Sequence, residues 1–176
     1  MEDQPRDPRF YQFLNAVRTD LEEAARLIAS DPSIINAMSG LGETALHYLV
    51  VENDFDAVEW LRQHGSDIDP TNIFGNTALE EAAALGYLKM CQYLVEHGAN
   101  PRHICLIPHG ETSPLSNAAS VGQIDVLKYL LSLFDANEDL NRYFSDMEIY
   151  RILEHHPKSA AILKASGLKM DVEFRP

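Results

Sequence analysis

The sequence predicts an all-α fold in which about five helix-turn-helix pairs follow one another as a solenoid. One observation is a 33-residue repeat: the stretches 42–67 and 75–100 both begin with a glycine and share further residues at that offset. Another is the helical spacing of apolar residues within each stretch, as at Val58 and Leu61. A fixed period of this size, with two helical segments per period, is typical of repeat proteins.

The N-terminal part is expected to be a flexible lead-in over residues 1–9 and a capping helix pair over 10–33. The lead-in carries two prolines and has no apolar periodicity. In the capping pair, Asp20 is placed to cap the second helix, and Asp31-Pro32 should end it because a residue before proline avoids the α region. Departure from the repeat pattern suits a terminal cap.

Three repeats are expected next, with boundaries at 34–66, 67–99 and 100–135. Each has a threonine or serine before its first helix, and the first two end at a glycine, the usual residue beyond a helix C-terminus. Phe55 is expected to point inward with Val58 and Leu61. The third repeat carries three extra residues before its first helix.

A divergent C-terminal cap is expected over 136–166, followed by a tail over 167–176. Apolar residues at helical spacing predict helices over 146–156 and 157–165. The acidic run 137–140 is expected to be solvated.

Composition limits the classes of partner. The 176 residues carry 14 Lys and Arg against 27 Asp and Glu, a formal charge of −13, which opposes binding to nucleic acid or to an anionic membrane. This charge would suit a basic protein partner; the alternative is that it serves only solubility. We see no apolar signal segment, membrane-length apolar run or disulfide framework, so we expect a cytoplasmic location.

The helix starts TALH, TALE and SPLS, with the glycines that follow them, resemble those of the ankyrin repeat family. The resemblance implies a scaffold that binds other proteins through a concave groove lined by loop tips and inner helices. The sequence has no Gly-rich phosphate loop, G-x-S-x-G or H-E-x-x-H motif, so we expect no catalytic residues and no cofactor, and we expect a monomer. His47 stands at the family's structural histidine position. Glu80 and Ser116 replace that histidine in the next repeats, which should remove a local hydrogen bond.

The family pattern, carried over position by position, gives the candidate partner-binding residues. They are Met38, Leu41, Glu43, Tyr48, Val51, Ile73, Phe74, Asn76, Glu81, Leu85, Arg102, His103, Ile104, Leu106, Ile107, His109 and Val121. Many are apolar, and an exposed apolar patch usually marks an interaction site. The alternative is that residues 104–107 fold back onto the neighbouring loop and that Tyr48 packs internally.

Two other classes of function stay open. Cys105 with His103 or His109, in the enlarged loop 102–111, could form part of a metal site or of a cysteine-based enzyme, although the two further metal ligands and an orienting third group are not evident. An exposed loop cysteine with chance neighbours is the simpler interpretation. A self-assembling structural subunit is a third hypothesis. We favour a non-enzymatic scaffold, with an inhibitor or immunity-type protein of a basic partner as one form of it.

Overall fold

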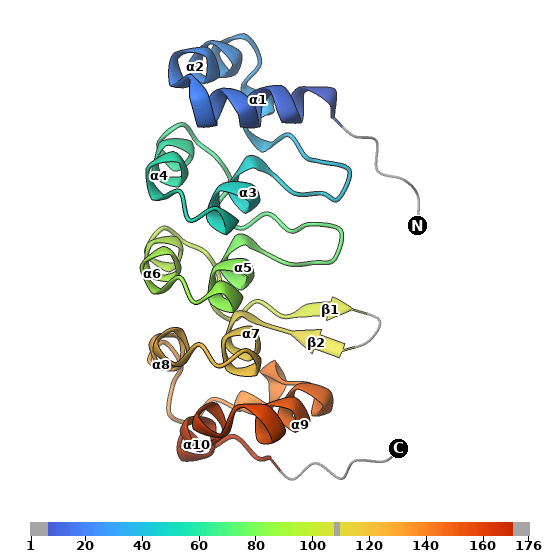
Figure 1. Ribbon diagram of the computed structural model, residues 1–176, viewed down its shortest axis with the longest axis vertical. Coiled ribbons are helices and arrows are strands. Elements are labelled where there is room, and N and C mark those ends of the chain that lie inside the picture. The colour runs from blue at the N-terminus through green and yellow to red at the C-terminus, as the bar shows by residue number, and fades with distance from the viewer. Residues whose placement is uncertain (1–6, 108–109, 171–176) are drawn as a thin grey trace. The chain divides into compact units, whose positions relative to one another are not determined.

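The computed structural model describes residues 7–107 and 110–170 and confirms the helical-repeat fold (Figure 1). Short helices follow one another in pairs joined by tight turns, with two short 3-10 segments, η1 and η2. The bounds are α1 (Pro8–Thr19), α2 (Leu21–Ser30), η1 (Pro32–Asn36), α3 (Ala45–Val51), α4 (Phe55–Gln63), α5 (Ala78–Leu85), α6 (Leu88–Glu96), α7 (Pro114–Ser120), α8 (Ile124–Leu131), η2 (Leu140–Tyr143), α9 (Asp146–His155) and α10 (Pro157–Ala165).

The chain forms two compact units, Met1–Ala78 and Leu79–Pro176, and each has its own apolar core. The helices supply these cores from one face, as their sequence periodicity predicts. The largest fully buried side chains of the first unit are Phe10, Phe13, Leu46, Leu49 and Leu61. Those of the second unit are Leu79, Met90, Leu94, Leu115, Leu127, Leu130 and Ile152.

The start of α3 shows why a histidine stands in the TALH segment. The backbone N–H of Thr44 donates to Nδ1 of His47 over 3.2 Å, so the other ring nitrogen carries the proton and donates to the carbonyl oxygen of Asn76 at 3.2 Å. Burial lowers the pKa of His47, which keeps the ring neutral as these two bonds require. His47 therefore joins the start of α3 to the loop before α5.

The expected loss of a hydrogen bond at Ser116 is wrong. Ser113 and Ser116 bond reciprocally at the start of α7: the Ser116 N–H donates to Ser113 Oγ at 3.0 Å, and the Ser113 N–H donates to Ser116 Oγ at 2.9 Å. Two N–H groups that have no partner within the helix are thereby satisfied. Ser116 therefore accepts a hydrogen bond from the backbone N–H three residues earlier, as His47 does at the start of α3.

The inward orientation expected for Phe55 is also wrong, since 37% of this residue is exposed. It is the first residue of α4, and the buried stripe of that helix consists of Ala57, Val58 and Leu61. The equivalent residues, Leu88 and Ile124, are only half-buried. This register position lies at the margin of the packed face in all three repeats.

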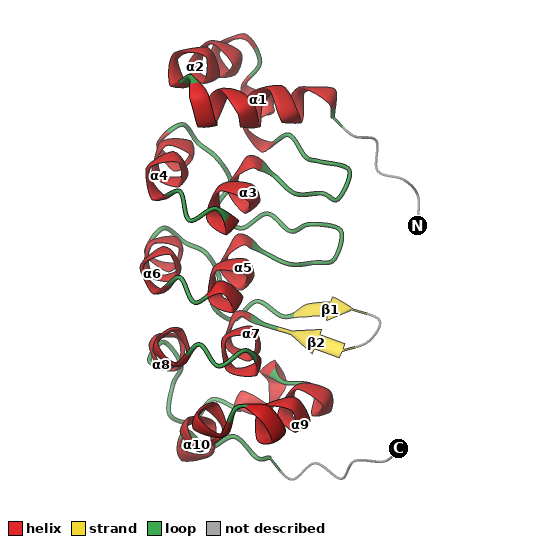
Figure 2. Ribbon diagram, in the orientation of Figure 1, coloured by secondary structure: helices red, strands yellow, loops and turns green. Residues whose placement is uncertain are grey.

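The enlarged loop of the third repeat is a short β-hairpin rather than an irregular loop (Figure 2). Strand β1 (Cys105–Ile107) pairs antiparallel with β2 (Gly110–Thr112), with Cys105 opposite Thr112. The three extra residues lengthen both arms enough for ladder hydrogen bonds to form, which the helical periodicity did not reveal. The fold class remains that of a helical solenoid.

Arg102 and the acidic segment after α8 form one structural cluster, so the expectation of a simply solvated run is wrong at Glu138. The Arg102 guanidinium donates from Nε and from a terminal nitrogen to the Glu138 carboxylate, at 3.0 Å in each case, and lies over the Phe134 ring at 4.7 Å. Tyr143 donates to the same carboxylate at 2.6 Å. The Arg102 hydrogen bonds lower the pKa of Glu138.

None of the helices in the described ranges 7–107 and 110–170 is both long enough and apolar enough to cross a lipid bilayer.

The packing predicts different costs for two leucine truncations on α5. Leu79→Ala removes a fully buried side chain and should lower the free energy of unfolding by about 2–5 kcal/mol. Leu85→Ala, a matched control on the exposed face, should change it by less than about 0.5 kcal/mol. Urea denaturation followed by far-ultraviolet circular dichroism measures both. Equal midpoints for the two variants would contradict the assignment of the buried face.

Candidate functional site

The two loops of the first unit, 38–43 and 71–77, are closed in the same way. The Ser39 N–H donates to the Glu43 carbonyl oxygen at 2.8 Å, and the Asn72 N–H donates to the Asn76 carbonyl oxygen at 3.0 Å. The donors are 33 residues apart, as are the acceptors. Each loop is therefore a closed finger whose tip is set by the repeat period.

A buried polar side chain holds each tip in shape. Ser39 Oγ accepts from the Leu41 and Glu43 N–H groups at 3.2 Å, and Asn72 Oδ1 accepts from the Phe74 and Asn76 N–H groups at 2.9 and 3.1 Å. Short polar side chains commonly bond to the backbone two residues further on in this way. Neither residue is among those predicted from the sequence, although their 33-residue separation was a usable signal.

The two fingers also bond to each other. The Ile73 N–H donates to the Leu41 carbonyl oxygen at 3.0 Å. Between them Gly42 has a φ of +72°, and a Cβ at this position would lie 2.9 Å from the Ile73 nitrogen. Only glycine permits both the left-handed backbone and this close approach.

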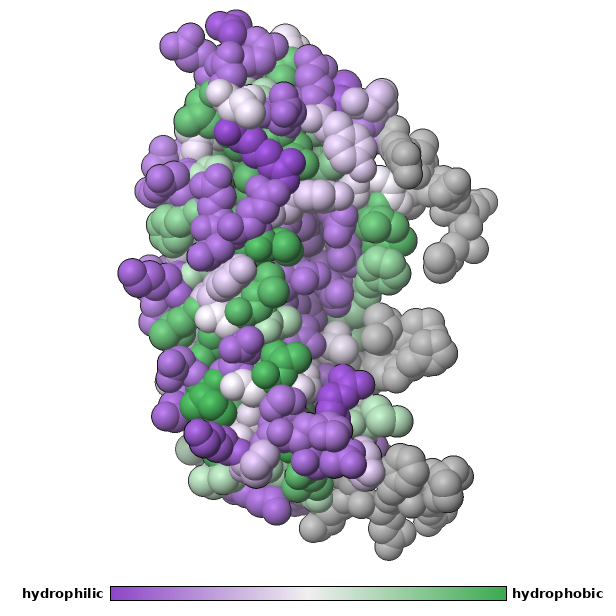
Figure 3. Space-filling model, in the orientation of Figure 1, coloured by the Kyte–Doolittle hydropathy of each residue, from purple (hydrophilic) through white to green (hydrophobic). Residues whose placement is uncertain are grey.

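The side chains at the tips are apolar and exposed. Between 42% and 50% of each residue in the loop-tip patch is accessible, and the patch consists of Met38, Leu41, Ile73 and Phe74. Figure 3 shows hydrophobic atoms along the edge where these loops project. Val51, on α3 of the same unit, is also exposed. Exposed apolar side chains on a hydrogen-bonded frame can bind a complementary apolar surface without first becoming ordered.

The other candidates of the first unit, Tyr48, Glu43 and Asn76, are less exposed than the residues of the loop-tip patch. Tyr48 is half-buried, its ring centroid lies 5.4 Å from that of Phe10, and burial raises the pKa of Tyr48 to about 12. The internal packing considered for Tyr48 is thus largely what the structure shows. Glu43 and Asn76 are half-buried at the bases of the two fingers.

The second unit holds the remaining candidates in varied settings. Leu85 and Val121 are exposed, whereas Glu81 and Ile104 are half-buried. Arg102 belongs to the Glu138 cluster, and His103 Nε2 lies 3.9 Å from Oε2 of the buried Glu80. Leu106 and Ile107 are described only as backbone. His109 lies outside the described residues.

A family model for ankyrin repeats in three copies matches residues 13–105, more than half of the chain. The chain belongs to the ankyrin repeat family.

Named relatives match about half of this chain. An inactive serine/threonine-protein kinase, TEX14, from Bos taurus is 38% identical over 98 residues, which is 56% of this chain and 6% of that protein. Protein phosphatase 1 regulatory subunit 27 from Mus musculus is 31% identical over 96 residues, which is 54% of this chain and 62% of the relative. A poly [ADP-ribose] polymerase tankyrase from Caenorhabditis elegans is 38% identical over 94 residues, 49% of this chain and 4% of that protein. The matches thus span less than two thirds of each relative.

Cys105 takes the loop-closing position of the third ankyrin repeat, so the expectation of an exposed cysteine is wrong. It lies 33 residues after Asn72 and 66 after Ser39, and only 2% of it is exposed. Burial raises the pKa of its thiol, and the negative charge of Glu80 adds to the rise. Within the parts of the chain that the structure describes, no three His, Cys, Asp or Glu side chains are grouped to hold a metal ion.

This placement predicts slow alkylation of Cys105. A raised pKa leaves less thiolate at pH 8 than a free thiol has, and burial limits access, so iodoacetamide should react more slowly than with glutathione. The rate should keep increasing above pH 9, near the ordinary thiol pKa of 9.0. Mass spectrometry of a Cys91→Ala variant isolates Cys105, and unfolding in urea should restore the rate of a free thiol. Faster reaction than glutathione at pH 8 would contradict the structural role.

Proposed function

We propose that this protein is a non-enzymatic scaffold that binds another protein through the loop-tip patch. The observation that carries the proposal is the combination of exposure and order at Met38, Leu41, Ile73 and Phe74. Apolar anchors that are fixed before binding lose little conformational entropy when a partner covers them. The half-buried Glu43 and the exposed Glu52 supply polar surroundings of the kind found at interface rims.

Membership in the ankyrin repeat family supports a role in protein interaction. One of the relatives is named as a regulatory subunit of protein phosphatase 1, and regulation of a bound protein is a role that fits this chain too. The charge of −13 favours a basic partner, since a negative surface speeds encounter with a positive one. An inhibitor or immunity-type protein is one form that such regulation could take, and we propose that the protein is monomeric and located in the cytoplasm.

The alternative functions have less support. A cysteine-based or metal-dependent enzyme would use the region 102–111, but Cys105 is buried there and its raised pKa disfavours the reactive thiolate. A self-assembling subunit would use the loop-tip patch against a second copy. Light scattering of the pure protein distinguishes that case from a monomer that binds a different protein.

The proposal predicts that two truncations at the finger tips weaken partner binding. Affinity capture from the native lysate with the wild-type protein identifies the partner, and titration of the purified pair then gives its affinity. Leu41→Ala combined with Phe74→Ala should weaken that affinity by about 2 kcal/mol or more, roughly 30-fold, because apolar anchors at the centre of an interface carry much of its energy.

A matched control truncates two exposed apolar residues of α9, Met147→Ala with Leu153→Ala, and should leave the affinity unchanged. Circular dichroism confirms that both double variants stay folded. Undiminished binding by the folded Leu41/Phe74 variant would overturn the proposal.

A further inference from the structure

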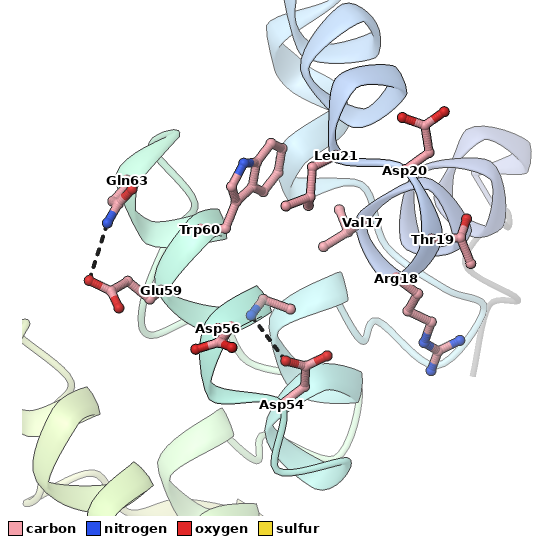
Figure 4. Close-up of a pocket in the computed structure, with 11 residues that line it drawn as sticks. Val17, Arg18, Thr19, Asp20, Leu21, Asp54, Asp56, Glu59, Trp60 and Gln63 are labelled. Atoms are coloured by element: carbon pink, nitrogen blue, oxygen red, sulfur yellow. Dashed lines mark hydrogen bonds between the residues drawn. The ribbon is translucent and has the colours of Figure 1, made fainter.

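A cleft of about 390 Å³ opens in the first unit between the corner that joins α1 to α2 and the helix α4 (Figure 4). Its lining comes from residues 17–21 and from residues 54–63. None of the loop-tip patch takes part. Within this unit the finger tips project on the opposite side from α2 and α4 (Figure 1), so the cleft is a separate candidate site.

One wall of the cleft is Trp60, the single tryptophan of the chain. The indole stacks on the His64 ring with centroids 3.9 Å apart, and His64 Nδ1 bonds to the Trp60 carbonyl oxygen at 2.8 Å. In the next repeat Tyr93 packs against His97 with ring centroids 4.2 Å apart and the ring planes tilted by 34°, but Tyr93 is buried. Trp60 is only half-buried, and Figure 4 shows its indole facing Leu21. The repeat thus holds an accessible aromatic surface in a fixed orientation.

Apolar groups continue this wall. Val17 and Leu21 lie on the side of the indole that faces the α1–α2 corner, and Leu21 is exposed. Because both come from the α1–α2 corner, the cleft has an apolar floor with an aromatic side. This surface would accept an aliphatic chain.

The remaining lining is strongly acidic. Four acidic residues belong to it: Asp20, Asp54, Asp56 and Glu59. The one arginine of the lining, Arg18, pairs with Glu52, which does not line the cleft, and in Figure 4 its guanidinium points away from the indole. Carboxylates around a cleft with apolar walls concentrate a negative potential inside it. The cleft is therefore suited to a cation.

The carboxylates differ in how they are used by the fold. Asp20 caps α2 through the Glu23 N–H at 3.0 Å, and Asp54 caps α4 through the Ala57 N–H at 3.1 Å. Glu59 accepts a hydrogen bond from Gln63 at 3.2 Å, and Asp56 lies exposed in the first turn of α4. Asp56 and Glu59 can therefore be neutralised without removal of a helix cap.

We propose that this cleft binds an arginine side chain presented by a basic segment of a partner protein. The three methylene groups of arginine would lie along Leu21 and Val17, and the planar guanidinium would stack on the indole of Trp60. The carboxylates then accept its N–H groups, in the paired geometry that suits a guanidinium. A bare metal ion fits less well, because the lining is half apolar and the described residues hold no group of three metal-ligating side chains.

The single tryptophan provides the test. The protein over residues 1–176, labelled with ¹⁵N, should show one indole N–H resonance, because it has one tryptophan, and this signal is followed as a blocked pentapeptide Gly-Gly-Arg-Gly-Gly is added. A matched Gly-Gly-Leu-Gly-Gly peptide controls for effects of the backbone. We expect saturable movement of the indole signal with the arginine peptide, with a Kd on the order of 1 mM, as for a single side chain of few atoms. Added salt should weaken the binding, and the leucine peptide should leave the signal in place.

Two variants make the test specific. Asp56→Asn with Glu59→Gln should weaken binding of the arginine peptide by roughly fivefold or more. Asp125→Asn removes a carboxylate at the equivalent first-turn position of α8, outside the cleft, and should have no effect. The inference is overturned if the indole resonance does not respond to the arginine peptide, if it responds equally to the leucine peptide, or if the Asp56/Glu59 variant binds as well as the wild type. Leu41→Ala with Phe74→Ala leaves the cleft intact, so this site and the loop-tip patch are tested separately.

Discussion

Burial of one apolar face per helix is the constraint on which this structure depends. The helices of the three repeats span only seven to nine residues. Helices this short are marginal in water by themselves. Their stability comes from the leucines that pack inside each unit, such as Leu46 and Leu61 in the first and Leu79 and Leu127 in the second. The hydrogen bonds at the helix N-termini determine the residue at which each helix begins.

The positions at which the helices begin determine the geometry of the two fingers. Because α3 begins at Ala45 and α5 at Ala78, the preceding residues must turn back within a few positions, and buried Ser39 and Asn72 satisfy the backbone groups of that turn. The tip side chains then have no core to enter and stay exposed. The same short turn therefore orders the backbone of each finger and leaves its tip side chains exposed. This combination makes the loop-tip patch suited to recognition.

The repeat period predicted the helical architecture because it reports directly on burial, as at Leu79 and Leu115. The exposed loop-tip residues Leu41 and Phe74 were predicted from the resemblance to the ankyrin repeat family. The repeat period failed as a predictor where a residue's role depends on a partner distant in sequence. Glu138 was predicted to be solvated, because the sequence does not show that Arg102 lies beside it. Cys105 was predicted to be an exposed loop residue, but the hairpin pairs it with Thr112 and its side chain is buried. The cleft at Trp60 could not be predicted either, since it depends on the gap between α4 and a corner some forty residues earlier in the chain.

We propose that recognition takes place at the two ordered fingers of the first unit. Hydrogen exchange followed by mass spectrometry, on the protein alone and in complex with its captured partner, tests it most directly. Recognition at the fingers should slow exchange in the complex for peptides that cover residues 38–43 and 71–77. Exchange that is unchanged in both fingers, with protection restricted to other segments, would contradict it.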